Sequence, residues 1–128
     1  MPADASVVRR LYEACEAHDL DAAAALIAPD VVWHEPYEYL GTLQGRDAVM
    51  DAIRQSMAET EGTFTLHLAD LLASQDHVVA LVDFSAQRHG RRMSGREVGV
   101  FRVADGRIAE VWFYTADDPD AVSEFMRG

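Results

Sequence analysis

The carboxylates and imidazoles that could do chemistry lie in three strand-like segments of the chain. Residues 31–36 read VVWHEP, so His34 and Glu35 follow an apolar run and precede a proline. His67 and Glu97 occur farther along, where apolar and polar residues alternate with the period of a strand. A carboxyl group among apolar side chains has a raised pKa, which suits a general acid or base working near neutral pH. We therefore take Glu35, Glu97 and His67 as the candidate catalytic residues.

Helices and strands predicted from the hydrophobic pattern must position these residues. Apolar residues recur at helical spacing in residues 4–18 and 46–59, and a short helix is expected to begin at Asp19 or Asp21 and to stop at Pro29. Later in the chain the period changes to about two, which predicts four long strands, over residues 63–73, 77–88, 91–103 and 107–115.

Three shorter segments complete the predicted fold. VVWHE is a short strand, residues 36–45 form a loop, and Asp118 caps a last helix in which Pro119 takes the first position. This order of elements predicts an α+β fold, with three helices packed on a curved, mostly antiparallel sheet. No break in composition divides the chain, so we expect residues 1–128 to form a single domain.

Composition argues against several classes of function. The chain is 49% hydrophobic and 26% charged, and its net charge of −11 argues against nucleic acid, whose phosphates would repel such a surface. No apolar run approaches the roughly 20 residues of a membrane span, and no export signal is recognised, so we expect a cytoplasmic protein. A single cysteine and the lack of a dinucleotide or phosphate-loop fingerprint predict neither a disulfide nor a cofactor. No metal site is expected, because His34, Glu35 and His67 would converge only if His34 turned inward.

The turn between the second and third long strands sets which of their residues share a face of the sheet. RHGR reads as a two-residue hairpin loop, so that Val82 faces Glu97. Asp83 then lies beside Arg96 on the opposite, outer face. We therefore interpret Asp83 as one half of a cross-strand ion pair and not as a catalytic acid.

The turn VADGR allows two registers for the last strand. A two-residue Asp-Gly loop would put Glu97 on the same face as Tyr114, whereas a three-residue loop, with Gly106 in the left-handed conformation, would pair Glu97 with Phe113. We choose the second register because it collects apolar residues on the inner face, namely Met93, Phe101, Val103, Val111 and Phe113. A tight SQDH turn places another set on that face: Thr65, His67, Ala69 and Leu71.

This arrangement predicts an apolar cup whose only ionisable groups from the long strands are His67 and Glu97. Their backbones lie on the order of 10 Å apart, so only long rotamers or a bound ligand could link them as a general-base pair. In the alternative interpretation each is satisfied separately, His67 by backbone or water and Glu97 by an arginine or a loop amide. The residues expected to contact a ligand are Trp33, His34, Tyr37, Tyr39, Val82, Phe84, Phe101, Val111 and Phe113.

Two stretches, LYEACEAHDLDAAAALIAPDVVWHEP…GTLQGRDAVMDAI and VGVFRVADGRIAEVWFY, resemble the nuclear transport factor 2-like superfamily. Within it the chain is most similar to the SnoaL-like branch, relatives of polyketide cyclases, ketosteroid isomerases and limonene epoxide hydrolase. The resemblance covers nearly the whole chain and implies a cone-shaped α+β barrel with a pocket inside, commonly dimeric through the outer sheet face. Such a fold does not by itself determine the reaction.

The resemblance also implies roles for single residues. The general base of ketosteroid isomerase is an acid directly before a proline at the end of the first strand, which is the place of Glu35; Trp33 then shares its face and His34 points away. An alignment to the epoxide hydrolase would turn His34 inward instead, and we prefer Glu35. The other family residues are missing. The isomerase tyrosine and second acid fall on Leu11 and Gly99, and the hydrolase Arg and two Asp fall on Ala80, Val82 and Phe113.

Two kinds of function fit these residues. The first is a cofactor-free enzyme that isomerises, cyclises or dehydrates a small hydrophobic molecule by general acid–base catalysis. The alternative is a non-catalytic ligand-binding or dimeric interaction domain. For a homodimer the outer face offers an apolar patch of Val98, Val100, Ile108, Trp112 and Tyr114, rimmed by Arg96, Arg102 and Glu110.

Overall fold

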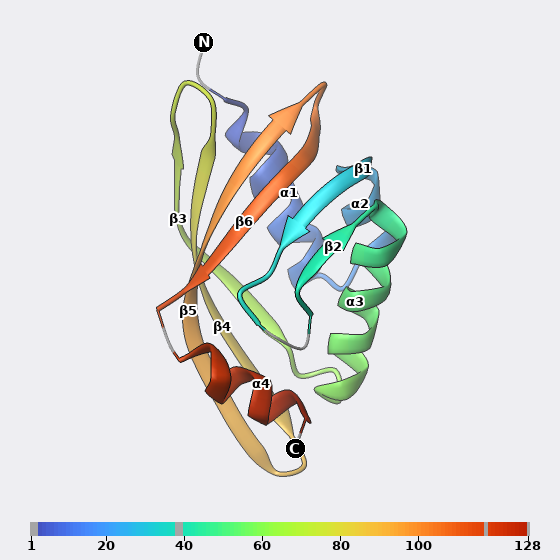
Figure 1. The fold of residues 1–128 in the computed structure, drawn as a ribbon, viewed down its shortest axis with the longest axis vertical. Coiled ribbons are helices and arrows are strands. Elements are labelled where there is room, and N and C mark those ends of the chain that lie inside the picture. Colours follow the sequence, from blue (N-terminus) through green and yellow to red (C-terminus); the bar gives the residue numbers. More distant parts are fainter. Residues whose placement is uncertain (1–2, 38–39, 117, 128) are drawn as a thin grey trace.

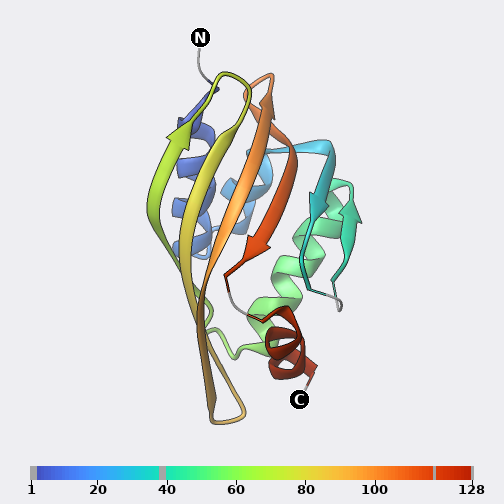
Figure 2. The same cartoon turned by 60° about the vertical axis from the view of Figure 1, so that its left-hand side comes forward.

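The computed structural model describes residues 3–37, 40–116 and 118–127, with the Arg127 side chain left aside. A curved six-stranded sheet carries three helices along one side, and a fourth helix lies beside the far ends of the long strands (Figures 1 and 2). The helices are α1 (Ala5–Glu16), α2 (Leu20–Ala25), α3 (Arg46–Glu59) and α4 (Pro119–Arg127). The strands are β1 (Ile27–His34), β2 (Thr42–Gln44), β3 (Thr65–Ala73), β4 (Val78–Arg88), β5 (Arg91–Ala104) and β6 (Arg107–Thr115).

The sheet has the order β2-β1-β6-β5-β4-β3, and only the β1–β6 pair is parallel. This confirms the predicted α+β class and the mostly antiparallel sheet. The sheet continues past the predicted strands, because Thr42–Gln44, expected within a loop, pairs with the end of β1. None of the described helices is long and apolar enough to cross a membrane.

The first two helices begin where the sequence predicts, and the second ends earlier. Asp4 and Asp19 cap α1 and α2 by accepting hydrogen bonds from the backbone N–H groups of Ser6 and Ala22. The prediction that Pro29 ends α2 is wrong, because β1 already begins at Ile27 and runs through Pro29. The β1–β6 ladder is irregular between Ile27 and Val32, so the missing N–H of proline breaks no regular pairing.

The register of β4 and β5 is the one predicted, with Val82 opposite Glu97 and Asp83 opposite Arg96. The predicted β5–β6 loop is wrong in detail. Asp105 and Gly106, both at positive φ, form a two-residue turn, and a bulge between Arg102 and Val103 then shifts the pairing.

The bulge has two consequences for which residues face inward. It restores the predicted segregation, with Phe101 opposite Val111 and both buried. Glu97, however, pairs with Thr115 and not with Phe113. Ile108, expected in the outer patch, lies on the turn side of the bulge and is fully buried in the core.

A second bulge, between Leu68 and Asp70, changes the face of the first half of β3. Leu71 faces inward opposite Ala80, as predicted. In the part of β3 that precedes the bulge, the alternation of faces is the reverse of the predicted one. Leu66 and Leu68 therefore pack on the core, while Thr65 and His67 are exposed. The expected inward orientation of Thr65, His67 and Ala69 is therefore wrong.

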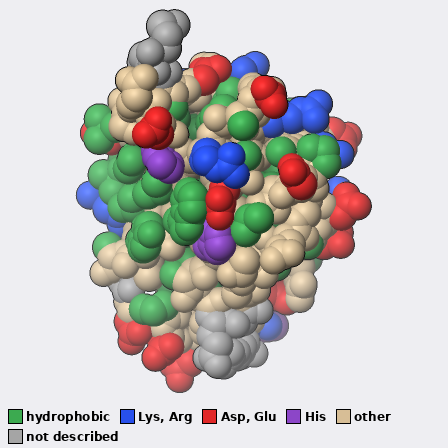
Figure 3. Space-filling model, turned by 45° about the horizontal axis from the view of Figure 1, so that its top comes forward, with side chains coloured by type: hydrophobic (Ala, Val, Ile, Leu, Met, Phe, Trp, Pro, Cys, Tyr) green, Lys and Arg blue, Asp and Glu red, His purple; other side chains and the backbone are tan. Residues whose placement is uncertain are grey.

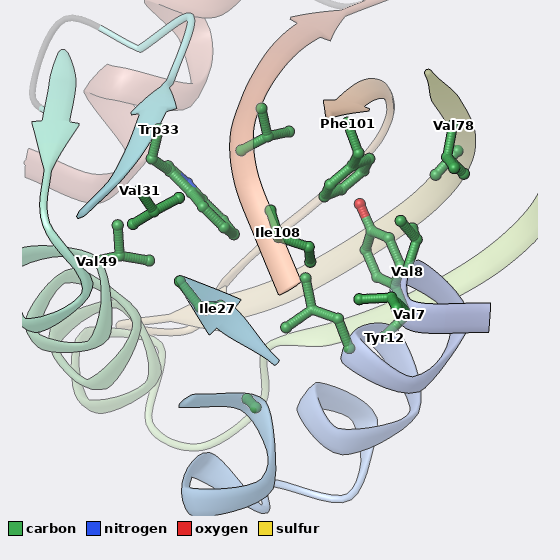
Figure 4. Packing of buried hydrophobic residues seen from close by; sticks show 14 of the residues in the cluster. Val7, Val8, Tyr12, Ile27, Val31, Trp33, Val49, Val78, Phe101 and Ile108 are labelled. Carbon is green, nitrogen blue, oxygen red and sulfur yellow. The ribbon is translucent and has the colours of Figure 1, made fainter. Parts of the chain in front are cut away.

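The main core lies between the inner face of the sheet and α1. Figure 4 shows Val7, Val8 and Tyr12 of α1 directed toward the strand residues Phe101 and Ile108. All five side chains are buried, and the Tyr12 and Phe101 rings meet edge to face with centroids 6.0 Å apart. Toward α3 and α4 the core opens into a cavity.

Candidate functional site

A cavity of about 120 Å³ lies between the inner face of the sheet, α1, α3 and α4. Its walls are mostly aromatic or aliphatic, and the described side chains that line it include no Arg, Lys or His. The polar side chains on its walls are Tyr12, Cys15, Glu35, Tyr37, Ser56 and Glu97. A largely apolar cavity with a few convergent polar groups is the usual form of a small-molecule site.

Glu35 reaches the cavity from the end of β1. Its backbone N–H donates to the Gly41 carbonyl (3.2 Å), which keeps the chain extended past the last strand residue. Strand alternation then puts the side chains of Trp33 and Glu35 on the same face, and the indole N–H donates to Oε1 of Glu35 across 2.8 Å. Burial raises the pKa of Glu35 to about 7, opposed by this hydrogen bond. The predicted inward orientation of Glu35 is confirmed.

Glu97 reaches the same cavity from the middle of β5. The Tyr37 hydroxyl donates to its Oε2 across 3.4 Å. Burial, and next the charge of Glu35, raise the pKa of Glu97 to about 8, while Tyr37 acts in the opposite direction. Both glutamates border the cavity, and both residues are half-buried. Because two ionised carboxylates repel each other in an apolar surrounding, the pair loses its protons in two steps.

Tyr12 is another polar residue on the cavity wall, and it was not among the site residues expected from the sequence. Its side chain is 4% exposed, and its hydroxyl has no hydrogen-bond partner among the described residues. Burial, followed by the charge of Glu97, raises its pKa well above the usual value. The alignment with the isomerase tyrosine pointed to Leu11, but both residues belong to the buried stripe of α1. The helical pattern alone placed Tyr12 in the interior.

The structure explains why the second acid of ketosteroid isomerase has no counterpart at Gly99. A Cβ atom there would lie 2.6 Å from the Phe101 ring and 3.1 Å from the Phe113 ring. These two rings pack edge to face at 5.8 Å and fill the space that a side chain would need. On the same strand and face, two residues away, Glu97 supplies a carboxyl group instead.

Both histidines named as site candidates lie outside the cavity. His67 pairs with Asp83 on the outer side of β3 and is exposed, so the proposed pair of His67 with Glu97 does not form. His34 also points outward: its Nε2 lies 2.8 Å from Oε2 of Glu110, and its ring stacks on Trp112 at 5.6 Å. Strand alternation from Glu35 gives this orientation, so the expectation that His34 contacts a ligand in the cavity is wrong.

The predicted ligand contacts divide into two groups. Trp33, Tyr37, Phe84 and Phe113 line the cavity as expected. The expectation is wrong for three others, which belong to the closed core and do not line the cavity: Val82, Phe101 and Val111. Tyr39 lies outside the described residues.

The outer face carries the cross-strand pairs that the register predicts. Arg96 donates to Asp83 across 2.8 and 3.3 Å, which confirms that Asp83 is half of an ion pair and not an inward acid. Arg102 lies 3.6 Å from Glu110. Among the described residues no three His, Cys, Asp or Glu side chains are grouped as metal ligands.

Comparison with known proteins assigns the family that this fold and cavity suggest. Residues 8–111 match the SnoaL-like domain, so the chain belongs to that family and to the nuclear transport factor 2-like superfamily. The uncharacterized protein Rv0034 of Mycobacterium tuberculosis is 33% identical over 126 residues, covering 96% of this chain and 95% of that protein.

Two solved structures show how closely the fold is shared. Bal32a, from a soil-derived mobile gene cassette, superposes with a TM-score of 0.90 at 30% identity, covering 96% of this chain and 95% of that one. A protein of unknown function with a cystatin-like fold from Xanthomonas campestris gives 0.83 at 29% identity and covers 94% of each chain. The predicted cone-shaped α+β fold is confirmed.

Proposed function

We propose that this protein is a cofactor-independent enzyme that moves a proton within a small, uncharged, hydrophobic molecule, as in an isomerisation, cyclisation or dehydration. One observation carries the proposal: the side chains of Glu35 and Glu97 line the same apolar cavity, where burial raises the pKa of both carboxyl groups. Such groups hold and release protons near neutral pH, as general acid–base catalysis requires. The family includes isomerases and epoxide hydrolases, which agrees with this class of chemistry.

The two acids fit complementary roles. Ionised Glu35 removes a proton from a carbon next to a carbonyl group, and protonated Glu97 gives its proton to the carbonyl oxygen. The electrons of the broken C–H bond form the C=C bond of an enol, and the π electrons of the carbonyl group form the new O–H bond. The enol then returns its O–H proton to Glu97 while a carbon takes the proton from Glu35. A simple ketone regains the proton at the same carbon and so exchanges hydrogen, whereas an unsaturated ketone passes through a dienol and can take the proton at a second carbon, which moves the double bond. The Tyr12 hydroxyl, buried without a described partner, supplies a further donor for the ligand oxygen.

The walls of the cavity favour a ligand without negative charge. The described lining has no cation that could neutralise a carboxylate or phosphate, and an unpaired buried charge is strongly unfavourable. Aromatic side chains from β1, β4 and β6, namely Trp33, Phe84 and Phe113, form flat surfaces for a ring. A ketone of one or two fused rings fits these conditions.

Exchange of carbon-bound hydrogen tests the proposal without the natural substrate. Ketones such as 1-indanone and 2-tetralone, first ranked by thermal shift, are incubated in D2O and their signals next to the carbonyl followed by proton NMR. We expect the protein to accelerate exchange, and Glu35→Gln to lower the rate by about 10²-fold or more. Glu110→Gln, whose carboxyl group lies on the outer face, is the matched control. Binding without exchange would support the non-catalytic alternative, and unchanged exchange in both Glu35→Gln and Glu97→Gln would refute the assignment.

We also propose that the outer sheet face pairs with a second copy of the chain. Figure 3 shows hydrophobic side chains gathered around basic, acidic and histidine groups on one face. Val98, Val100 and Trp112 are only half-buried there, and Tyr114 is 57% exposed. Both the Arg96–Asp83 and Arg102–Glu110 pairs lie among these residues, so a rotated copy could set arginine against acid. Light scattering should give a dimer mass, and Trp112→Asp should reduce it to the monomer; a monomeric wild type would overturn this proposal.

A further inference from the structure

The two acids of the cavity have different kinds of hydrogen-bond partner. The indole nitrogen of Trp33 is a donor only, and its N–H reaches Oε1 of Glu35 at 2.8 Å. The Tyr37 hydroxyl, 3.4 Å from Oε2 of Glu97, can donate or accept. Glu97 therefore keeps a partner in either protonation state. The partner of Glu35 favours the carboxylate, because a hydrogen bond to a charged acceptor is the stronger one.

Packing holds the Trp33 indole in this orientation. The side chain is 7% exposed, and its ring lies against Phe113 with centroids 5.1 Å apart. Phe113 is itself packed edge to face on Phe101. Within the sheet the Trp33 backbone pairs with Leu43 on one side and Val111 on the other. The indole N–H is thus held in place without a ligand. Glu35 lies two residues away on the same face of the strand, within hydrogen-bond distance of this donor.

We propose that Trp33 is a positioning residue that decides which acid of the pair ionises first: it holds Glu35 as the carboxylate, so that the single remaining proton rests on Glu97. This inference deepens the proposed function, since it makes Glu35 the base and Glu97 the acid. Removal of the indole N–H would bring the pKa values of Glu35 and Glu97 closer together, so that the remaining proton would be shared between them and neither would be fixed as base or acid.

Few other titratable groups face the pair. From α1 the cavity is lined by Tyr12 and Cys15, and burial raises the pKa of both, so neither adds charge near pH 7. Tyr37 lines it from the loop after β1. The described residues that line it from α3 and α4 carry no titratable side chain, and neither do those from β4 and β6. The order of ionisation is therefore set mainly by the local partners of the two glutamates.

NMR titration of protein labelled with ¹³C at the glutamate carboxyl carbons tests the inference, with Glu35→Gln and Glu97→Gln assigning the signals. In the wild type, Glu35 should ionise before Glu97. In Trp33→Phe, which keeps an aromatic ring against Phe113, the midpoint of Glu35 should rise by roughly one pH unit. Trp112→Phe makes the same chemical change on the outer face and should leave both midpoints in place. Unchanged midpoints in Trp33→Phe, or Glu97 ionising first in the wild type, would overturn the inference.

A second measurement does not depend on whether Trp33→Phe folds. In the Trp112→Phe protein the only indole is that of Trp33, so its N–H proton signal can be followed directly against pH. We expect it to shift with the lower of the two carboxyl midpoints; a shift with the higher midpoint, or none, contradicts the inference. Both titrations proceed without substrate. If the titrations show the expected order of ionisation but the protein does not accelerate exchange in ketones, only the proposed function fails. If the protein accelerates exchange but Glu97 ionises first, only the role of Trp33 fails.

Discussion

Replacement of Glu97 by glutamine should change how the stability of the protein depends on pH. The folded protein keeps the Glu97 proton up to a pKa of about 8, whereas the unfolded chain releases it near the usual 4.5. Between these values the folded state binds more protons, so the free energy of unfolding falls as pH rises, by about 1.36 kcal/mol per pH unit and group. Below 4.5 and above 8 this group contributes no slope.

The size of the effect follows from the width of that pH window. A shift from 4.5 to about 8 corresponds to at most roughly 5 kcal/mol. Water that enters the cavity lowers this figure, so a difference of about 2–4 kcal/mol is a reasonable expectation. Glutamine cannot ionise. The free energy of unfolding of Glu97→Gln should therefore rise relative to that of the wild type as pH increases, whatever the difference between the two proteins is at pH 5.

Thermal unfolding from pH 5 to pH 9 provides the assay. The melting temperature of Glu97→Gln relative to the wild type should rise by on the order of 10 °C across this range, since about 1 kcal/mol corresponds to a few degrees in a chain of this size. Glu13→Gln, a change of the same kind at an exposed position on α1, controls for the loss of one charge. Parallel curves for Glu97→Gln and the wild type would show that the carboxyl group is solvated and would remove the basis of the proposed chemistry.

Further changes separate the roles of individual residues. Gly99→Ala should lower stability by about 1–3 kcal/mol in denaturant unfolding, because its Cβ would meet the Phe101 ring; an unchanged midpoint would mean that the rings move freely. Tyr12→Phe should leave stability unchanged or slightly increased, since the hydroxyl has no described partner to lose, yet weaken the binding of ketones in calorimetry. A clear loss of stability instead would reveal a structural hydrogen bond. Arg88→Ala should make the end of α4 exchange amide hydrogens faster, because Arg88 Nη1 donates to the carbonyls of Phe125 and Met126; unchanged protection would mean that packing alone holds α4.

The parts of the fold that sequence predicted are those with a local cause. The β4–β5 register follows from the two residues of the RHGR turn, and that single turn correctly separated Glu97 from Asp83. The inward orientation of Glu35 was preferred from the resemblance to ketosteroid isomerase, and alternation along VVWHE then placed Trp33 with it and His34 on the other face. The start of the second helix, expected at Asp19 or Asp21 and found with Asp19 as its cap, likewise depends only on neighbouring residues.

The errors arise where one residue interrupts the alternation of a strand. A bulge between Leu68 and Asp70 turns His67 outward, and no turn or glycine in LHLADLL signals it. The bulge between Arg102 and Val103 in the β5–β6 pair shifts the pairing by one residue. The predicted loop was one residue too long, so this shift left most inward-facing residues as predicted. Tyr12 was missed because its pattern on the helix shows only that the residue is buried. That its hydroxyl has no hydrogen-bond partner among the described residues becomes visible only when the surrounding residues are placed.

The positions of Gly99 and Glu97 suggest how the site of this chain differs from that of ketosteroid isomerase. Aromatic packing of Phe101 and Phe113 over Gly99 leaves no room for an acid there, and the nearest inward position on the strand is two residues away. The carboxyl group of Glu97 accepts a hydrogen bond from the Tyr37 hydroxyl across 3.4 Å and borders the same cavity as Val122 and Met126 of α4. The carboxyl group of Glu97 therefore lies two residues along the strand from the place of the isomerase acid, and the resemblance does not determine the reaction of this chain. A ligand for this protein should therefore be sought among uncharged rings whose oxygen and acidic C–H group match the separation of Glu97 and Glu35, and not among steroids or epoxides alone.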